Sequence, residues 1–88
     1  MQVSVQVSVY PLGQTDLAPA IEAMWRVFQQ HQLVFHAGTM STVLEGDDEQ
    51  VFTALCEAFR AAAQFGAAVM AATVSNACPR VPVEESEG

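Results

Sequence analysis

Hydrophobic and polar residues alternate strictly through the first ten positions of the chain. Valine stands at positions 3, 5, 7 and 9, and Gln, Ser and Tyr side chains stand between them. Successive side chains of a strand point to opposite faces, so this period of two predicts a strand over residues 2–10 with one apolar and one polar face. Pro11 and Gly13 end it, because proline cannot donate to a ladder and glycine favours a turn.

Two later segments repeat apolar residues at helical spacing. The first predicts a helix from Asp16, as its N-cap, to about Gln32, with an apolar stripe at Leu17, Ile21, Met24 and Phe28. The second predicts a helix that begins at a capping box of Asp47 and Gln50 and stops at Gly66. Its inward stripe is Val51, Leu55, Ala58, Phe59, Ala62 and Phe65.

Three further segments have the character of strands. Residues 33–37 and 39–45 predict a hairpin that breaks at Gly38. Residues 68–75 are small and apolar, so we expect an inner strand, buried on both faces. The order β-α-β-β-α-β predicts an α+β ferredoxin-like plait, a four-stranded antiparallel sheet with both helices on one face. The expected core is Val5, Val7, Ile21, Met24, Phe28, Leu44, Val51, Leu55, Phe59 and Val74.

Length and composition limit the number of domains and the classes of partner that the chain can have. Eighty-eight residues, 51% of them hydrophobic, predict a single domain over residues 1–76, followed by a polar, flexible tail over residues 77–88. The net charge of -7 argues against nucleic acid or an anionic membrane as a partner. The N-terminus has no signal-peptide pattern and no apolar run is long enough to cross a bilayer, so we expect a cytoplasmic protein.

Residues that commonly carry catalysis or metals are sparse. Cys56 falls on the apolar stripe of the second helix, so we expect a buried free thiol, and Cys78 lies in the tail. His31 and His36 have no nucleophile at a suggestive spacing, and Cys and His do not recur at metal-ligand spacing. RNA-binding domains share the predicted topology, but residues 39–45 contain no aromatic or basic side chain. We therefore expect no enzyme, no metal and no RNA site.

The polar face of the predicted sheet is the candidate functional surface. It carries hydroxyls and apolar groups together, a mixture that favours a ligand site, a subunit contact or both. Its members on the three long strands are Ser4, Gln6, Ser8 and Tyr10, then Thr39, Ser41, Val43 and Glu45, and finally Val69, Ala71, Thr73 and Ser75. A slip of one residue in register would replace Ser41 by Thr42 or Met40.

Three stretches together carry a family resemblance. They are residues 8–13 (SVYPLG), 38–46 (GTMSTVLEG) and 73–75 (TVS). In this order and spacing the chain resembles the YkoF-like family of small thiamine-binding proteins, over about residues 3–76. The resemblance implies a homodimer or homotetramer that binds thiamine or its hydroxymethylpyrimidine moiety without catalysis or cofactor. Family members often end the last strand with an Arg-containing segment, from which the stretch leading to Arg80 departs.

If the ligand resembles thiamine, the residues at the outward ends of the strands have expected roles in binding it. Tyr10 would offer a stacking surface and Glu45 would pair with the cation or amine of the ligand. Hydrogen bonds would come from the hydroxyls of Ser8, Thr39, Ser41, Thr73 and Ser75. His36 and Asn76 are reserve candidates because both lie close to strand ends. The alternative is an oligomerisation module, whose hydroxyl-rich face is only a subunit contact.

Overall fold

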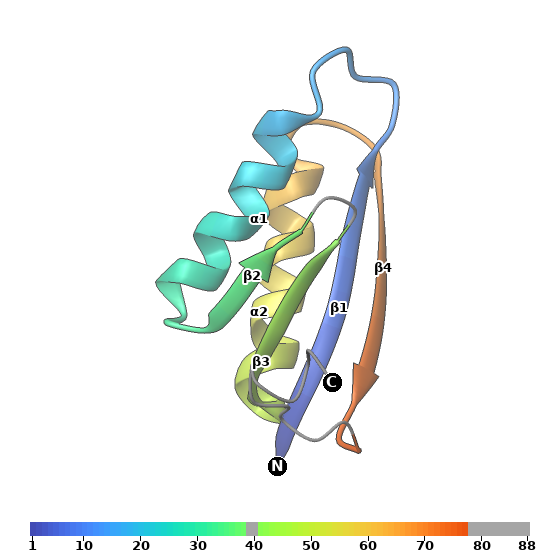
Figure 1. Ribbon diagram of the computed structural model, residues 1–88. Helices are drawn as coiled ribbons and strands as arrows, with labels where there is room; N and C mark the ends of the chain where they lie inside the picture. The colour runs from blue at the N-terminus through green and yellow to red at the C-terminus, as the bar shows by residue number, and fades with distance from the viewer. Residues whose placement is uncertain (39–40, 78–88) are drawn as a thin grey trace.

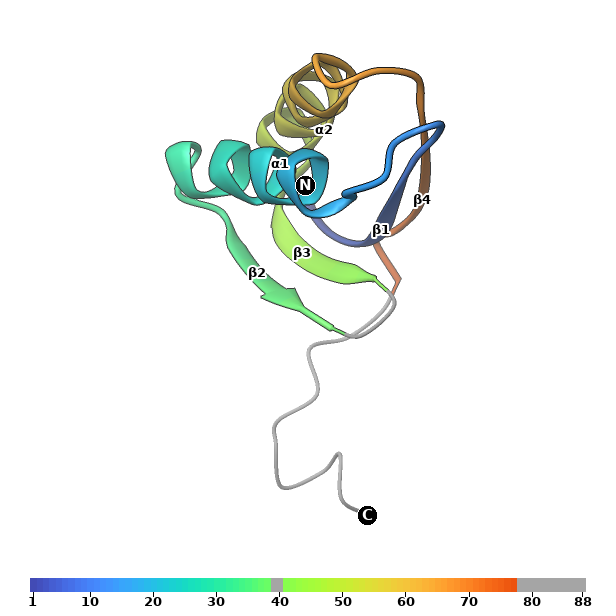
Figure 2. The same cartoon turned by 90° about the horizontal axis from the view of Figure 1, so that it is seen from above.

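The computed structural model describes residues 1–38 and 41–77, which form one sheet and two helices (Figure 1). The elements are β1 (Gln2–Pro11), α1 (Ala18–Gln30), β2 (Val34–Ala37), β3 (Thr42–Asp47), α2 (Asp48–Ala63) and β4 (Ala68–Ser75). The strand order is β2-β3-β1-β4, and both helices lie on the same face of the sheet (Figure 2). The predicted ferredoxin-like α+β plait is confirmed.

Strand β1 is the centre of the sheet and sets the register of its neighbours. It pairs antiparallel with β3 and with β4, so that Val5 lies opposite both Leu44 and Val74. Opposite residues of a ladder point to the same face, so the neighbours inherit the alternation of β1. The register confirms the predicted polar face on all three strands. Its residues are Ser4, Gln6, Ser8 and Tyr10 on β1, Val43 and Glu45 on β3, and Val69, Ala71, Thr73 and Ser75 on β4. We call it the open face, because the helices lie on the other side.

The core lies between the valine face of β1 and the two helices. The four valines of β1 are 0–7% exposed. Phe28 of α1 is fully buried and meets the ring of Phe35 edge to face, with centroids 5.8 Å apart. Seven of the predicted core residues are confirmed as buried: Val5, Val7, Met24, Phe28, Leu44, Val51 and Leu55.

Five burial predictions are wrong, and a sixth holds only in part. Leu17, Phe59, Phe65 and Val74 are 46%, 38%, 48% and 37% exposed, Cys56 is an exposed thiol, and Ile21 is half-buried. Strand β4 is an edge strand rather than the inner strand expected, because it stands at the end of the strand order and pairs only with β1. Cys56 and Phe59 lie on the flank of α2, beyond the stripe that packs on the sheet.

The predicted helix caps also differ from the structure. Asp16 accepts a hydrogen bond from the Ala18 amide at 3.1 Å, but the N-cap position of α1 belongs to Leu17. Asp47 is the N-cap residue of α2 without a capping hydrogen bond, because its carboxylate binds the Met1 ammonium at 2.9 Å. The expected partner in the capping box, Gln50, instead donates to the carbonyl of His31 at 2.8 Å.

Several predicted boundaries shift by a few residues. Strand β3 runs from Thr42 to Asp47, so Glu45 lies inside the strand rather than at its end. Helix α1 ends at Gln30 and α2 at Ala63, short of the predicted stops. The bounds of β4 match the prediction. Within the described residues, no helix is long and apolar enough to cross a membrane.

Removal of a buried ring from the helix–sheet interface tests the core assignment. We expect Phe28→Ala to lower the free energy of unfolding by about 3–5 kcal/mol, because the ring is fully buried and its loss leaves a cavity. Leu12→Ala, at a half-exposed side chain, should cost less than about 0.5 kcal/mol. Urea denaturation of both variants measures the difference, and equal losses would contradict the assignment.

Candidate functional site

A pocket opens where β1 continues past the end of its ladder with β3. That ladder ends at the Val7–Thr42 pair, whereas β1 runs on to Pro11. The space of about 200 Å³ beside this end lies between α1, β1 and the β2–β3 hairpin. Its lining residues are Ile21, Met24 and Trp25 from α1, Ser8, Val9 and Tyr10 from β1, and Gly38, Ser41 and Thr42 from the hairpin. We call it the α1–β1 pocket.

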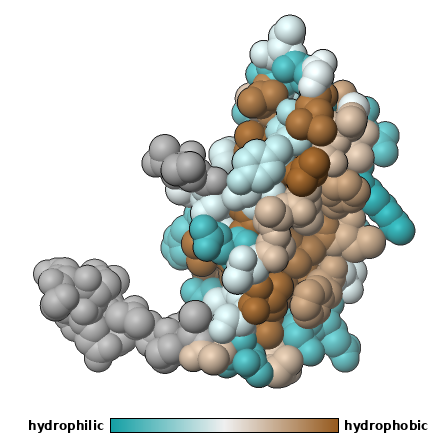
Figure 3. All heavy atoms as spheres, turned by 90° about the vertical axis from the view of Figure 1, so that its right-hand side faces the viewer, coloured by the Kyte–Doolittle hydropathy of each residue, from teal (hydrophilic) through white to brown (hydrophobic). Residues whose placement is uncertain are grey.

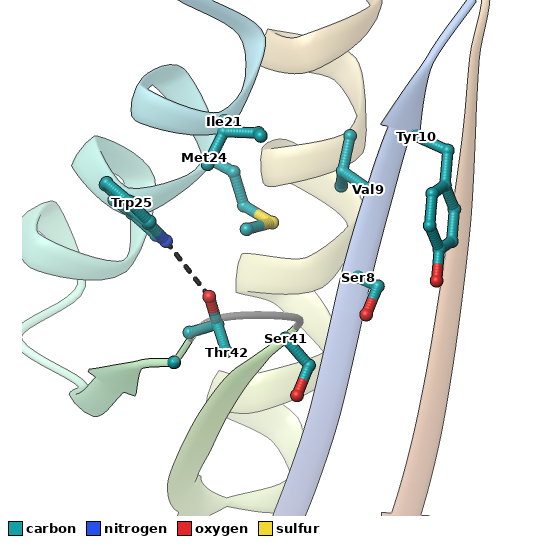
Figure 4. Close-up of a pocket in the computed structure, with 9 residues that line it drawn as sticks. Ser8, Val9, Tyr10, Ile21, Met24, Trp25, Ser41 and Thr42 are labelled. Atoms are coloured by element: carbon teal, nitrogen blue, oxygen red, sulfur yellow. Dashed lines mark hydrogen bonds between the residues drawn. The ribbon is translucent and has the colours of Figure 1, made fainter. Parts of the chain in front are cut away.

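The α1–β1 pocket has an apolar side and a hydroxyl-bearing side (Figure 4). Met24 reaches from α1 toward Val9, while the hydroxyls of Ser8 and Tyr10 lie on the other side of β1. The lining residues carry hydroxyls, a thioether and two aromatic rings, and none of them bears a formal charge. The pocket can therefore hold a neutral polar ring by stacking and hydrogen bonds, and it offers no charge partner to an ion.

A buried hydrogen bond fixes one wall of the pocket. The indole Nε1 of Trp25 donates to the hydroxyl of Thr42 at 3.0 Å (Figure 4). Thr42 is 3% exposed, because it lies opposite Val7 and points to the helix side of the sheet. A buried hydroxyl and a part-buried indole N–H satisfy each other, so this bond ties α1 to the hairpin and orients the indole.

The structure divides the predicted site residues between two places. Ser8, Tyr10 and Ser41 line the α1–β1 pocket. Thr73 and Ser75 line a shallow hollow of about 340 Å³ on the open face, together with Ser4, Val5, Gln6 and Val43. A hydrogen bond of 3.3 Å from Gln6 Nε2 to Ser41 Oγ connects the two places. Thr39 lies outside the described residues.

Glu45 lies near the hollow and away from the pocket. It sits opposite Ser4 on β1 and opposite Val34 on β2. Four residues of β1 separate Ser4 from Ser8, which is about 13 Å at roughly 3.3 Å per residue. A single ring in the α1–β1 pocket therefore lies beyond the reach of Glu45.

The two reserve candidates lie outside the pocket lining. His36 pairs with Val43 in the β2–β3 ladder. Asn76 Nδ2 donates to the sulfur of Met1 at 3.1 Å, at the other end of β1 from the pocket. Neither residue shares a wall with Ser8 or Ser41.

Sequence reasoning missed the helix side of the pocket. The apolar stripe of α1 places Met24 in the expected core, and Trp25 stands beside that stripe in the sequence. Met24 is indeed buried, but Trp25 is half-buried, and both line the pocket. Trp25 stands beside the stripe and carries an N–H that needs a partner, which is the signal that distinguishes it from a purely apolar core residue.

The ionised groups with shifted pKa values lie far from the pocket. The Met1 ammonium donates hydrogen bonds to the carboxylates of Asp47 and Asp48, which raises the pKa of the ammonium, and the same ammonium lowers the pKa of Asp48. These groups sit at the start of β1, whereas the pocket lies at its end. In the part of the chain that the structure describes, no group of three His, Cys, Asp or Glu side chains is placed to hold a metal ion.

Comparison with known proteins gives the family of the chain. The model of the YKOF-related family matches residues 2–81, nearly the whole chain. The chain belongs to the YkoF-related family. A search of curated proteins finds no match.

Solved structures share the fold of this YkoF-related chain at low sequence identity. A hypothetical protein from Methanocaldococcus jannaschii is 24% identical, with a TM-score of 0.82 over 97% of this chain and 91% of that one. A domain of unknown function from Bacillus cereus is 22% identical, with a TM-score of 0.79 over 97% and 86%. A protein from Thermotoga maritima proposed to act in thiamine biosynthesis or salvage is 20% identical, with a TM-score of 0.80 over 98% and 95%. At these identities the likeness shows the fold.

Loss of the Thr42 hydroxyl tests the wall of the pocket. Thr42→Val keeps the shape of the side chain but leaves the Trp25 N–H without its acceptor, so we expect a loss of about 1–3 kcal/mol in the free energy of unfolding. In a Trp25→Phe background, Thr42→Val should lower the free energy of unfolding by clearly less, because no indole N–H then lacks an acceptor. A double-mutant cycle by urea denaturation measures the coupling, and additive losses would show that the bond is not a stabilising contact.

Proposed function

We propose that this chain binds the hydroxymethylpyrimidine moiety of thiamine, free or as part of thiamine, in the α1–β1 pocket, without catalysing a reaction on it. The family of the chain and the description of the Thermotoga maritima protein support a thiamine-related role. The observation that carries the proposal is the uncharged lining of the pocket, which combines the apolar side chains of Met24 and Val9 with the indole of Trp25 and the hydroxyl residues Ser8, Ser41 and Thr42.

The chemistry of the lining favours an aminopyrimidine. Such a ring is flat and polarisable, so it can lie against an indole and a thioether, which make favourable contacts with aromatic rings. Its ring nitrogens, amino group and hydroxymethyl group need both donors and acceptors, and a hydroxyl such as that of Ser8 or Ser41 supplies either. No His, Cys, Asp, Glu or Lys is among the lining residues to move a proton, which supports binding without catalysis.

The size of the pocket favours the pyrimidine over whole thiamine. A volume of about 200 Å³ is below the range of about 300–1,000 Å³ that is usual for sites of drug-sized ligands. It suits a single substituted ring. If thiamine itself binds, its cationic thiazolium must lie outside the pocket, toward the open face that carries Glu45, Thr73 and Ser75. Glu45 is then its charge partner, because a carboxylate pairs with a cation.

The alternative function is that of an oligomerisation module. Val34, Val43 and Val69 on the open face are 54%, 42% and 49% exposed, and a second subunit would cover them. In this case the hydroxyls of the open face serve a subunit contact, and the chain takes up no small molecule. We propose a homodimer or homotetramer under either function.

Fluorescence of Trp25 tests the binding site directly. Trp25 is the one tryptophan of the chain, so its emission reports on the pocket without interference from other indoles. We expect hydroxymethylpyrimidine to change this emission in a saturable titration that agrees with calorimetry. Ser8→Ala and Ser41→Ala should each weaken binding by about 1 kcal/mol, roughly fivefold in Kd, because each removes one hydrogen-bonding group. Ser4→Ala, on the same strand outside the pocket, is the matched control and should leave Kd unchanged.

Glu45→Gln separates the two ligands. It should leave the affinity for hydroxymethylpyrimidine unchanged and weaken the affinity for thiamine by about 1–3 kcal/mol, because only the thiazolium would meet the carboxylate. Equal effects of Ser4→Ala and Ser8→Ala would place the ligand elsewhere. If calorimetry shows no heat and Trp25 emission does not change with either ligand at millimolar concentration, the binding function is rejected. The oligomerisation module is then the function that remains.

A further inference from the structure

Hydrogen bonds hold the part of the hairpin that lines the α1–β1 pocket. The Gly38 amide donates to the carbonyl of Ser41 at 2.8 Å. Trp25 Nε1 donates to the hydroxyl of Thr42 at 3.0 Å. A further bond comes from outside the lining, where Gln6 Nε2 donates to Ser41 Oγ at 3.3 Å. The backbone around Ser41 is thus held in place, and Gln6 acts on the hydroxyl itself.

The register of β1 and β3 brings the Gln6 amide within reach of Ser41. Gln6 lies opposite Val43, so Ser41, two residues before Val43, is its diagonal neighbour. Diagonal neighbours of an antiparallel pair are about 7–8 Å apart, a gap that long side chains can cross. Gln6 is exposed on the open face, and the view from the side of β4 shows polar side chains bordering an apolar band (Figure 3). The bond to Ser41 therefore joins this face to the pocket.

The direction of this bond sets the hydrogen-bonding role of Ser41. A serine hydroxyl has one proton to donate and two lone pairs that accept. The amide nitrogen of Gln6 offers only protons, so the hydroxyl of Ser41 accepts there and cannot donate back. The proton of the hydroxyl must then go to a different acceptor, and the adjoining space that Ser41 lines is the pocket. Ser41 is therefore a donor toward an occupant of the pocket.

We propose that Gln6 is a positioning residue of the α1–β1 pocket, which keeps the Ser41 hydroxyl as a hydrogen-bond donor to an acceptor atom of the bound ring. This role rests on the proposed function and adds to it the polarity of one contact. Gln6 is not among the lining residues, so it acts on the ligand through Ser41.

The matching atom of an aminopyrimidine is a ring nitrogen. Its lone pair accepts a hydrogen bond in the plane of the ring, whereas the amino group of the same ring donates. A hydroxyl that can turn freely serves either group, but one held by Gln6 serves only the acceptor. The bond from Gln6 therefore favours one orientation of the ring in the pocket and disfavours a ring that presents an N–H to Ser41, because two donors would then face each other.

An exchange of the donor at position 6 for an acceptor tests this role. Gln6→Glu keeps the length of the side chain, but an ionised carboxylate only accepts, so the Ser41 hydroxyl would donate to it instead of to the ligand. We expect Kd for hydroxymethylpyrimidine, from Trp25 emission and calorimetry, to rise about fivefold, as in Ser41→Ala. Hydroxymethylpyrimidine is the probe, because a new carboxylate beside the hollow would attract the thiazolium of thiamine.

The control for the added charge is Gln2→Glu. Gln2 lies on the same face of β1 as Gln6 and lines neither the pocket nor the hollow. This variant should therefore leave Kd unchanged. Circular dichroism must show that each variant is folded.

Two further variants separate the polarity of the bond from the loss of a contact. Gln6→Met removes the amide and lets the Ser41 hydroxyl turn toward the ligand, so Kd should rise by about twofold at most. In the Ser41→Ala background, Gln6→Glu should cause no further change in Kd, because no hydroxyl remains to be oriented.

The possible results distinguish this role from the proposed function. If the unsubstituted protein and Gln6→Glu bind hydroxymethylpyrimidine equally well, Gln6 does not orient Ser41, while the proposed function stands. Equal losses in Gln6→Met and Gln6→Glu would also overturn the role, and so would an undiminished effect of Gln6→Glu in the Ser41→Ala background. If the unsubstituted protein binds no ring, the proposed function fails and the role of Gln6 fails with it.

Discussion

The burial of one face of β1 under two helices is the constraint on which the rest of this structure depends. Four valines, 0–7% exposed, fill the space between β1 and the helices. Because a strand alternates, the same packing turns Ser4, Gln6 and Ser8 to the other side. Residues paired with β1 in β3 and β4 point to the same face as their partners. The register with β1 therefore determines which hydroxyls share a face.

The features proposed for function lie where this helical cover ends. Along β1, the ladder with β3 stops at Val7 and leaves room for the α1–β1 pocket beside Ser8. Across the sheet, β4 stands at the edge beside β1, and most of its residues are exposed (Figure 2). Contacts with α2 cover this margin of the sheet only in part. In this chain the margin carries alanine, valine and methionine instead of charge.

Charge is separated from the pocket along β1. The Met1 ammonium, Asp47 and Asp48 form an ion-pair cluster at the start of the strand, with distances of 2.9 and 3.1 Å. The pocket at its other end is lined by uncharged groups and braced by the Trp25–Thr42 hydrogen bond. A neutral ring is therefore the ligand that this pocket suits, while the acidic groups contribute to solubility and to the start of α2.

The sequence by itself determined the element order, the bounds of β4, the polar face of the sheet and most of the core. These follow from local periodicity, which is written into consecutive residues such as Val5, Gln6 and Val7. It also placed Ser8, Tyr10 and Ser41 together, because register along β1 carries over to its neighbours. The capping box at Asp47 failed because a distant group, the Met1 ammonium, took the carboxylate.

Only the tertiary structure decided which apolar residues are covered. Phe59 and Val74 have the same periodicity as buried neighbours, but strand order and helix placement leave them exposed. The same holds for Trp25, whose role as a pocket wall depends on a hairpin residue distant in the chain, Thr42. Periodicity reports which face of an element is apolar. How far that face is covered depends on contacts between elements, and these exist only once the chain has folded.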